Sequence, residues 1–224
     1  MSGGVFVTGT DTGSGKTFVA QTVLRHFRAQ GVRAVGFKPV AAGARWCDGQ
    51  LRNDDALALS VASDQQLPYD AVNPYCFEPP IAPHLAAAAQ GIEISAQKIL
   101  VALDKLRRTH DFVVVEGAGG WMVPLSASLD IAGLARVMDL PVLLVVGLRL
   151  GCLNHALLSE RAIRSSGARL IGWVGSEIEP GMACLNENVA TLVERIGVPC
   201  LGVLTHPDSP GRLLPPRPLT LAGL

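Results

Sequence analysis

Short apolar segments alternate with amphipathic ones along most of the chain, and this alternation predicts strands and helices in turn. The apolar segments begin with Val5-Phe6-Val7 and continue at residues 32–40, 111–117, 141–147, 169–175 and 200–204. Between them, apolar residues recur every three or four positions, which predicts helices at residues 18–30, 54–62, 95–110, 130–138, 154–166 and 184–196. Gly31 suits the end of the first helix, and Asn53 suits the N-cap of the second. Residues 43–52 are polar and are expected to form a loop, and residues 63–83 show no clear period.

Nearly continuous apolar strands that alternate with helices indicate a parallel sheet covered on both faces. The predicted fold is therefore α/β, with three layers and a mainly parallel central sheet. A chain of 224 residues can form one such domain, and no internal repeat divides it, so we expect residues 1–224 to be a single domain. The C-terminal tail, residues 207–224, is rich in proline and is expected to be an extended surface segment.

Composition narrows the classes of protein to consider. The net charge is zero and no block of like charge occurs, which argues against nucleic acid as the main partner. The five cysteines are scattered, as free thiols in a reducing compartment are, and they suit neither a disulfide framework nor a zinc site. The N-terminus does not resemble a leader, and no apolar run has the length of a membrane span. We therefore expect a cytoplasmic protein without a membrane partner.

The first strand runs into a loop rich in glycine and threonine, Thr8-Gly9-Thr10-Asp11-Thr12-Gly13-Ser14-Gly15-Lys16-Thr17, and a helix follows. This is the layout of a P-loop, in which backbone N–H groups and a helix N-terminus surround a phosphate. Lys16 would reach the outer phosphates, and the Thr17 hydroxyl would hold Mg²⁺. Thr10 stands where the usual pattern has its first glycine, so the strand before and the helix after carry the assignment. The alternative is a glycine-rich turn with a solvated lysine.

Polar residues follow other predicted strands at the same edge of the sheet, where ligands of such sheets bind. Glu116 ends the strand at 111–117, the place where P-loop enzymes keep the carboxylate that serves Mg²⁺. The glycine-rich run after it would let the backbone approach a ligand, or would form a plain turn. Lys38 ends the second strand and could offset charge in phosphoryl transfer, although a solvated lysine is equally compatible with the sequence.

Two further features leave their roles open. Asp54 and Asp55 begin a helix, where acidic residues favour the positive end of the dipole, and spacing does not say whether either reaches a metal. Gly151-Cys152-Leu153-Asn154-His155 opens a helix after a buried strand, so its free N–H groups could bind an anion such as a carboxylate. His155 fits a packed or exposed residue better than a catalytic one.

Several runs together resemble the dethiobiotin synthetase family, and the likeness extends from the first strand to about residue 205. These runs are Val7-Thr8-Gly9-Thr10-Asp11-Thr12, Gly15-Lys16-Thr17, Lys38-Pro39-Val40, Arg52-Asn53-Asp54-Asp55-Ala56, Val72-Asn73-Pro74-Tyr75, Glu116-Gly117-Ala118-Gly119-Gly120, Leu150-Gly151-Cys152-Leu153-Asn154-His155 and Gly172-Trp173-Val174. The resemblance implies a P-loop NTPase-like fold and a cyclo-ligase of biotin biosynthesis. Such an enzyme converts 7,8-diaminopelargonate (7,8-diaminononanoate), CO₂ and MgATP to dethiobiotin, ADP and phosphate. One amine forms a carbamate, ATP phosphorylates it, and the second amine closes the cyclic urea by expelling phosphate.

The resemblance also implies a role for individual residues. Lys38 and Lys16 would be catalytic, and Thr17, Asp55 and Glu116 would serve Mg²⁺, which decides between the two aspartates. The ATP-binding set it implies is Gly13, Ser14, Gly15, Lys16, Thr17, Phe18, Asp55, Glu116, Gly117, Ala118, Gly119, Ser176, Glu177, Thr205, His206 and Pro207. The substrate-binding set is Lys38, Ala42, Gly151, Cys152, Leu153 and Asn154. The family is a homodimer, so the last four would bind the substrate carboxylate of the neighbouring subunit.

Three positions depart from the family pattern. Ala42 stands where a serine or threonine usually contacts the diamine, so one substrate hydrogen bond is lost. Ser176 stands where an asparagine reads adenine, and a hydroxyl cannot pair with two positions of the base as an amide can. Asn188 replaces an aromatic hydroxyl seen near the substrate carboxylate in some members. We therefore expect a weaker preference for ATP over other nucleoside triphosphates.

Two other classes share this style of P-loop. Amidotransferase-type synthetases of the cobyrinate group carry a separate glutaminase domain, for which 224 residues leave no room. Partitioning and cell-division switch ATPases carry a lysine early in the loop, where this chain has Asp11. They also commonly bind membranes through a basic amphipathic tail, whereas this tail is rich in proline.

Overall fold

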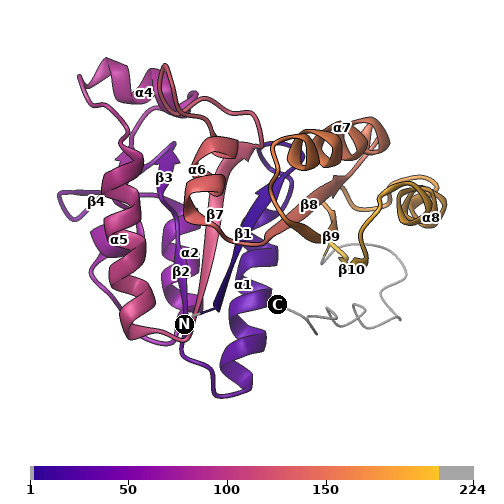
Figure 1. The fold of residues 1–224 in the computed structure, drawn as a ribbon, viewed down its shortest axis with the longest axis horizontal. Coiled ribbons are helices and arrows are strands. Elements are labelled where there is room, and N and C mark those ends of the chain that lie inside the picture. Colours follow the sequence, from indigo (N-terminus) through magenta and orange to yellow (C-terminus); the bar gives the residue numbers. More distant parts are fainter. Residues whose placement is uncertain (1–2, 207–224) are drawn as a thin grey trace.

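The computed structural model describes residues 3–206 and contains, within that range, a six-stranded central sheet with the strand order β10-β9-β8-β1-β7-β2 (Figure 1). All neighbours in this sheet pair in parallel. The strands are β1 (Gly3–Gly9), β2 (Ala34–Phe37), β7 (Phe112–Gly120), β8 (Val142–Leu148), β9 (Leu170–Glu177) and β10 (Cys200–Leu204). The predicted fold class is therefore confirmed. The carboxyl ends of these strands form one edge, and the loops at that edge carry the site.

Helices cover both faces of the sheet and make the outer two layers (Figure 1). One face packs on α1 (Lys16–Ala29) and α2 (Asp54–Ala62). The other packs on α5 (Ala96–Thr109), α6 (Ile131–Met138), α7 (Cys152–Ser165) and α8 (Leu185–Arg195). In α5 the buried residues Ile99, Leu103 and Leu106 recur at helical spacing, so a single stripe faces the sheet. The strands are buried from both sides, which is why their sequences are apolar throughout.

Smaller elements differ from the sequence-based expectation. The strand expected at 32–40 is interrupted at Lys38-Pro39, because proline has no N–H to donate, and β3 (Val40–Ala42) pairs instead with β6 (Tyr75–Phe77). The expected loop at 43–52 is a hairpin of β4 (Arg45–Cys47) and β5 (Gln50–Arg52). Asp48 and Gly49 connect its strands with φ values of 49° and 75°, the conformation that an Asp-Gly pair favours in a two-residue turn.

The segment at 63–83 holds short elements without enough residues to show a period: α3 (Tyr69–Val72), β6 and the start of α4 (Pro83–Ala89). The predicted N-cap of α2 is confirmed, since the Asn53 side chain accepts hydrogen bonds from the N–H groups of Asp55 and Ala56. None of the helices between residues 3 and 206 combines the length and apolar content that a membrane span requires. The expected proline-rich tail, residues 207–224, lies outside the described residues.

Candidate functional site

The loop between β1 and α1 has the conformation of a phosphate-binding loop. Gly13 and Gly15 adopt φ values of 74° and 88°, which favour glycine, and Lys16 begins the helix. Gly15 occupies the N-cap position and offers no side chain, so the first N–H groups of α1 are available to an anion. Gly15 is also sterically required, because a Cβ there would lie 2.1 Å from Ser176 Oγ.

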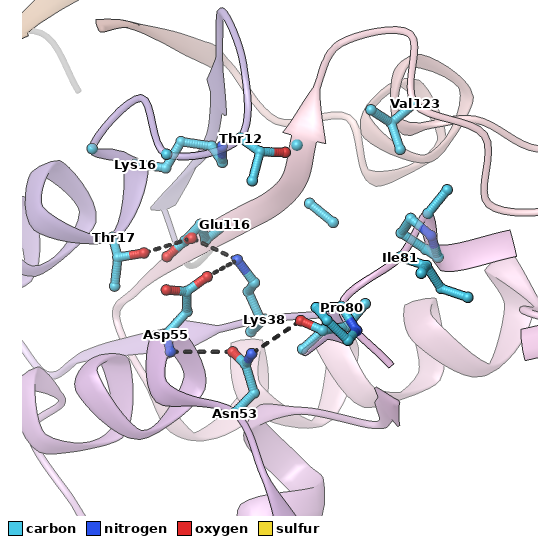
Figure 2. A pocket seen from close by; sticks show the side chains of 18 of the residues that line it. Thr12, Lys16, Thr17, Lys38, Asn53, Asp55, Pro80, Ile81, Glu116 and Val123 are labelled. Carbon is cyan, nitrogen blue, oxygen red and sulfur yellow. Dashed lines mark hydrogen bonds and ion pairs between the residues drawn. The ribbon is translucent and has the colours of Figure 1, made fainter. Parts of the chain in front are cut away.

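A compact cluster of charges lies beside this loop, at the end of β2, within β7 and at the start of α2 (Figure 2). Glu116 does not end its strand as expected, because β7 continues through the glycine run to Gly120. Lys38 Nζ donates to Glu116 Oε1 at 2.6 Å and to Asp55 Oδ2 at 2.8 Å. The Thr17 hydroxyl donates to the same Glu116 oxygen at 2.9 Å. The side chains of Lys38 and Glu116 are 4% and 0% exposed, whereas that of Asp55 is 43% exposed and faces the cavity. Three predicted polar residues thus meet around one lysine.

Burial and charge set the protonation of the cluster. Burial alone would lower the pKa of Lys38, but the charges of Glu116 and Asp55 outweigh it and raise the pKa, so the ammonium form is stabilised. Burial raises the pKa of Glu116, and Lys38 opposes that shift only in part. The pKa of Asp55 is lowered, because Lys38 outweighs the effect of burial. Burial, and then the charge of Lys38, lower the pKa of Lys16 to about 8.

The donor set fits a magnesium ion. Glu116 Oε2 is buried and has no hydrogen-bond partner among the described residues, so this oxygen is free to coordinate a cation. No group of three or more His, Cys, Asp or Glu residues in the described chain could enclose a metal alone. Mg²⁺ commonly binds through one or two carboxylates and completes its shell with water and phosphate oxygens. The carboxylates of Asp55 and Glu116, together with the Thr17 hydroxyl, match this coordination preference.

A cavity of about 720 Å³ opens over this cluster. Most of the predicted phosphate, metal and amine ligands line it: Gly13, Gly15, Lys16, Thr17, Phe18, Lys38, Ala42, Asp55, Glu116, Ala118 and Gly119. The opposite wall is largely apolar and includes Pro80, Ile81 and Val123 (Figure 2). One end of the cavity can therefore hold anions and the other an aliphatic chain.

Other predicted residues lie outside the cavity wall. Ser14 is buried beneath the loop, and Gly117 packs against the Phe6 ring. Ser176 faces Gly15 from the end of β9. Glu177 Oε2 accepts the backbone N–H of His206 at 3.0 Å, which fixes the chain just beyond Thr205. Pro207 lies outside the described residues.

The four residues at the start of α7, Gly151, Cys152, Leu153 and Asn154, do not line this cavity. Gly151 has a φ of 94° and serves as N-cap, and Cys152 is buried. The segment is tied to the phosphate-binding loop by Arg149, whose guanidinium lies 2.8 Å from Asp11 Oδ2. A ligand bound at the N-terminus of α7 would therefore lie outside the cavity of the same chain.

Several residues that line the cavity are not assigned to the site from the sequence: Thr12, Ala41, Asn53, Pro80, Ile81, Ala82, Pro83 and Val123. Most come from the aperiodic segment and from loops that tertiary contacts bring together. For Asn53 a signal existed, because an N-cap two residues before Asp55 must lie beside it.

A phosphate-binding loop joining a strand to a helix, with lysines and carboxylates at the carboxyl edge of a parallel sheet, defines a P-loop nucleotide-binding protein. The structure is similar to that of FtsY from Thermotoga maritima, with a TM-score of 0.54 and 16% identity over 92% of this chain and 62% of that one. It is also similar to FtsY from Elizabethkingia anophelis in complex with GDP, with a TM-score of 0.53 and 16% identity over 91% and 57%. The chain spans less than two thirds of these two proteins, and at such identity the likeness concerns the fold alone.

Sequence comparison is more specific. A family model described as "AAA domain" matches residues 3–209. The chain is 49% identical to the ATP-dependent dethiobiotin synthetase BioD of Xylella fastidiosa (strain 9a5c) over 97% of this chain and 94% of the relative. It is 49% identical to the protein of that name from Aromatoleum aromaticum (90% and 89% covered) and 50% to that from Xanthomonas euvesicatoria (88% and 88%). The chain belongs to the ATP-dependent dethiobiotin synthetase family.

Proposed function

We propose that this protein catalyses the ATP-dependent carboxylation and ring closure of 7,8-diaminopelargonate to dethiobiotin. The observation that carries the proposal is the buried ammonium group of Lys38, held by two carboxylates in a cavity that the phosphate-binding loop also lines. The names of the relatives, which share about half of the residues, support an ATP-dependent enzyme of this kind.

Each chemical step requires negative charge to be offset. An amine attacks CO₂ and loses a proton to give a carbamate. A carbamate oxygen then attacks the γ-phosphorus of ATP, and the bond to ADP breaks. The second amine attacks the carbonyl carbon of the mixed anhydride, phosphate leaves with the electron pair, and the cyclic urea forms. No residue of the protein needs to act as a nucleophile, so positioning and charge do the catalytic work.

Different residues would neutralise the carbamate and the phosphates. Lys38, fixed by Glu116 and Asp55, faces the cavity and would neutralise the carbamate next to the transferring phosphoryl group. Lys16, together with N–H groups at the start of α1, would neutralise the phosphates. Neither lysine depends on the other for its position, because Lys16 donates to the Asp11 carbonyl oxygen at 2.8 Å.

Thr17, Asp55 and Glu116 would hold Mg²⁺, which supplies charge neutralisation between the phosphates when bound. The buried Glu116 Oε2 atom, without a partner among the described residues, supports this assignment. Ser176, Glu177, Thr205 and His206 would border the base, since Ser176 lies against Gly15 of the loop and the neighbouring Glu177 accepts the N–H of His206.

The substrate carboxylate requires a site of its own. The N-terminus of α7, with its N-cap at Gly151, would receive that carboxylate from the neighbouring subunit of a homodimer. The position of this helix start outside the cavity of its own chain supports an arrangement between subunits.

The direct test incubates the protein with diaminopelargonate, bicarbonate and MgATP and detects dethiobiotin by mass. We expect product in stoichiometric proportion to ADP, and ATP hydrolysis that depends on the diamine. ATP hydrolysis stimulated by DNA or by lipid vesicles but not by the diamine would reject the proposal and favour a switch ATPase. A homodimer in solution would support a site formed between subunits. So would activity that returns when inactive Lys38→Ala protein is mixed with an inactive variant at the start of α7.

A further inference from the structure

Lys38 and four residues near it form a closed hydrogen-bonded ring, which we call the Tyr69 circuit: Lys38, Asn53, Asp55, Tyr69 and Asn73. Asn73 Nδ2 donates to the Lys38 carbonyl oxygen at 2.7 Å, and Tyr69 Oη donates to Asn73 Oδ1 at 2.9 Å. The Asn53 N–H donates to Tyr69 Oη at 2.7 Å, and the Asp55 N–H donates to Asn53 Oδ1 at 3.1 Å. Asp55 Oδ2 accepts from Lys38 Nζ at 2.8 Å, which closes the ring.

The members of the circuit come from separate elements. Lys38 follows β2, Asn53 and Asp55 open α2, and Tyr69 and Asn73 lie in and directly after α3. The sequence between these elements contains a hairpin and irregular loops, which by themselves do not fix the distance from Lys38 to Asp55. The Tyr69 hydroxyl is the junction, because it accepts from one side of the ring and donates to the other.

Three of the five members of the circuit are buried, while Tyr69 is half-buried and Asp55 faces the cavity. Lys38, Asn53 and Asn73 are 3%, 7% and 3% exposed. The Arg52 guanidinium lies 4.2 Å from the centre of the Tyr69 ring and covers its face. Burial, and then the contact with Cys76, raise the pKa of Tyr69, so the hydroxyl keeps the proton that it donates. Polar groups without access to water keep their partners, and a ring of such bonds is a rigid support.

We propose that Tyr69 and Asn73 are positioning residues that hold Lys38 and Asp55 in the geometry required for catalysis. Neither reaches the cavity, and both act through the two residues that do. The inference rests on the proposed function, because it concerns the lysine to which that function assigns the carbamate and the transferring phosphoryl group. It also gives a role to the Val72-Asn73-Pro74-Tyr75 run, which lies outside the site itself.

The chain offers a matched control. Tyr75 is the other tyrosine of the chain and is buried. Its hydroxyl likewise accepts a backbone N–H, from Ser95 at 2.9 Å, and donates to a carbonyl oxygen, that of Glu93 at 3.3 Å. Tyr69→Phe and Tyr75→Phe therefore each remove a hydroxyl group, and each leaves one backbone N–H and one carbonyl oxygen without its hydrogen-bond partner. They differ in whether those partners support Lys38 and Asp55.

The experiment compares both variants with Asn73→Ala and with the double variant Tyr69→Phe/Asn73→Ala. We expect kcat to fall about tenfold or more in Tyr69→Phe, because small misplacements of a catalytic group are costly, while KM for ATP stays within about twofold. Tyr75→Phe should keep kcat within about twofold even where its thermal unfolding shifts equally. The double variant should lose no more kcat than the more impaired of the two single variants, since both substitutions break the same ring.

Hydrogen exchange gives a reading that does not depend on activity. The amides of residues 53–56 should exchange faster in Tyr69→Phe, and those of Ser95 and its neighbours should do so in Tyr75→Phe. Equal kcat in the two tyrosine variants, additive losses in the double variant, or unchanged exchange at 53–56 would each overturn the proposal. A wild-type protein that makes no dethiobiotin would instead reject the proposed function. If Tyr69→Phe does not fold, Asn73→Ala alone decides, with the same kcat criterion.

Discussion

Replacing Lys38 by methionine tests the electrostatic centre of the site. Methionine keeps an unbranched stem of similar length, so the main loss is the ammonium group that contacts Glu116 at 2.6 Å and Asp55 at 2.8 Å. Asp55 is partly exposed and can be solvated. Glu116 is 0% exposed, so without Lys38 it must either carry a buried charge or take up a proton.

The loss of stability in Lys38→Met depends on whether Glu116 stays charged or takes up a proton. Leaving one partner of a buried ion pair alone costs about 3 to 5 kcal/mol when it stays charged. Protonation sets a ceiling, because neutralising a carboxyl group with an unperturbed pKa of about 4.3 costs about 4 kcal/mol at pH 7 and only about 1 kcal/mol at pH 5. Burial already raises the pKa of Glu116 in the native protein, and loss of Lys38 raises it further.

The raised pKa of Glu116 makes the folding stability of Lys38→Met depend on pH. Between the unfolded carboxyl value and the raised folded value, the folded variant binds more protons than the unfolded chain, so its stability falls as pH rises. Urea denaturation of Lys38→Met should therefore show a larger deficit against wild type at pH 7.5 than at pH 5. Lys105→Met, at an exposed position of α5, is the control and should show little deficit at either pH.

The same variant should lose turnover about a hundredfold or more, because a charge aimed at the transition state is removed. Its affinity for ADP should change by less than about threefold, since the proposed function assigns the phosphates that ADP retains to the loop and Lys38 to the transferring group. A destabilisation of equal size at pH 5 and pH 7.5 would refute the assignment of the penalty to Glu116. Near-normal kcat would refute the catalytic role of Lys38.

Three further predictions concern single positions. Ala42→Ser should lower KM for the diamine by about two- to tenfold, the value of one recovered hydrogen bond, as measured by initial rates; an unchanged KM would exclude that contact. With Ser176 near the base, kcat/KM for ATP should exceed those for CTP and GTP by less than about a hundredfold, and a larger ratio would contradict this account. The hydrogen bonds and charge of Arg33 lower the pKa of Asp111 to about 2, so the stability from this pair is present above the unfolded value of about 3.9 and is lost as pH falls toward 2. The deficit in Tm of Arg33→Gln should accordingly shrink between about pH 5 and pH 3, and a constant deficit would argue against the pair.

The parts of the site that local patterns determine could be predicted from the sequence. Lys16 follows β1 and its loop, and Lys38 follows β2, so in a parallel sheet both lie at the same edge. Glu116 is expected to end its strand, but β7 continues through the glycine run to Gly120, so Glu116 reaches the same edge from within the strand. The predicted cap at Asn53 is in place because an amide before a helix has few better partners than its first N–H groups.

The choice between Asp54 and Asp55 required the placement of α2. The Asp54 side chain is 77% exposed and pairs with Arg45 outside the site, whereas Asp55 pairs with Lys38. A signal was present in the helix itself, since Asp55 precedes the buried Leu59 by four positions and so shares its face. The family resemblance pointed to the same residue.

The apolar wall and the Tyr69 circuit could not be predicted in this way. Tyr69, Asn73 and Ile81 belong to a segment of short elements whose positions depend on contacts with β2, β3 and α2. No periodicity exists over four or five residues, and a buried asparagine or tyrosine hydroxyl has no partner that spacing can name. Such residues are identified only when the chain has brought their partners together.

The arrangement of the cluster bears on how it could accept its ligands. Lys38 contacts Glu116 through Oε1, while Oε2 of the same carboxylate is buried and lacks a hydrogen-bond partner among the described residues. A cation that binds Oε2 therefore need not displace Lys38, and the ammonium group can stay fixed while nucleotide and metal enter. Within the cluster, the charges of two lysines and two carboxylates nearly balance, so a triphosphate adds charge that the N–H groups of α1 and the metal would offset. Under the proposed function, the same carboxylate, the most deeply buried acid of the site, would orient Lys38 through one oxygen and serve the metal through the other.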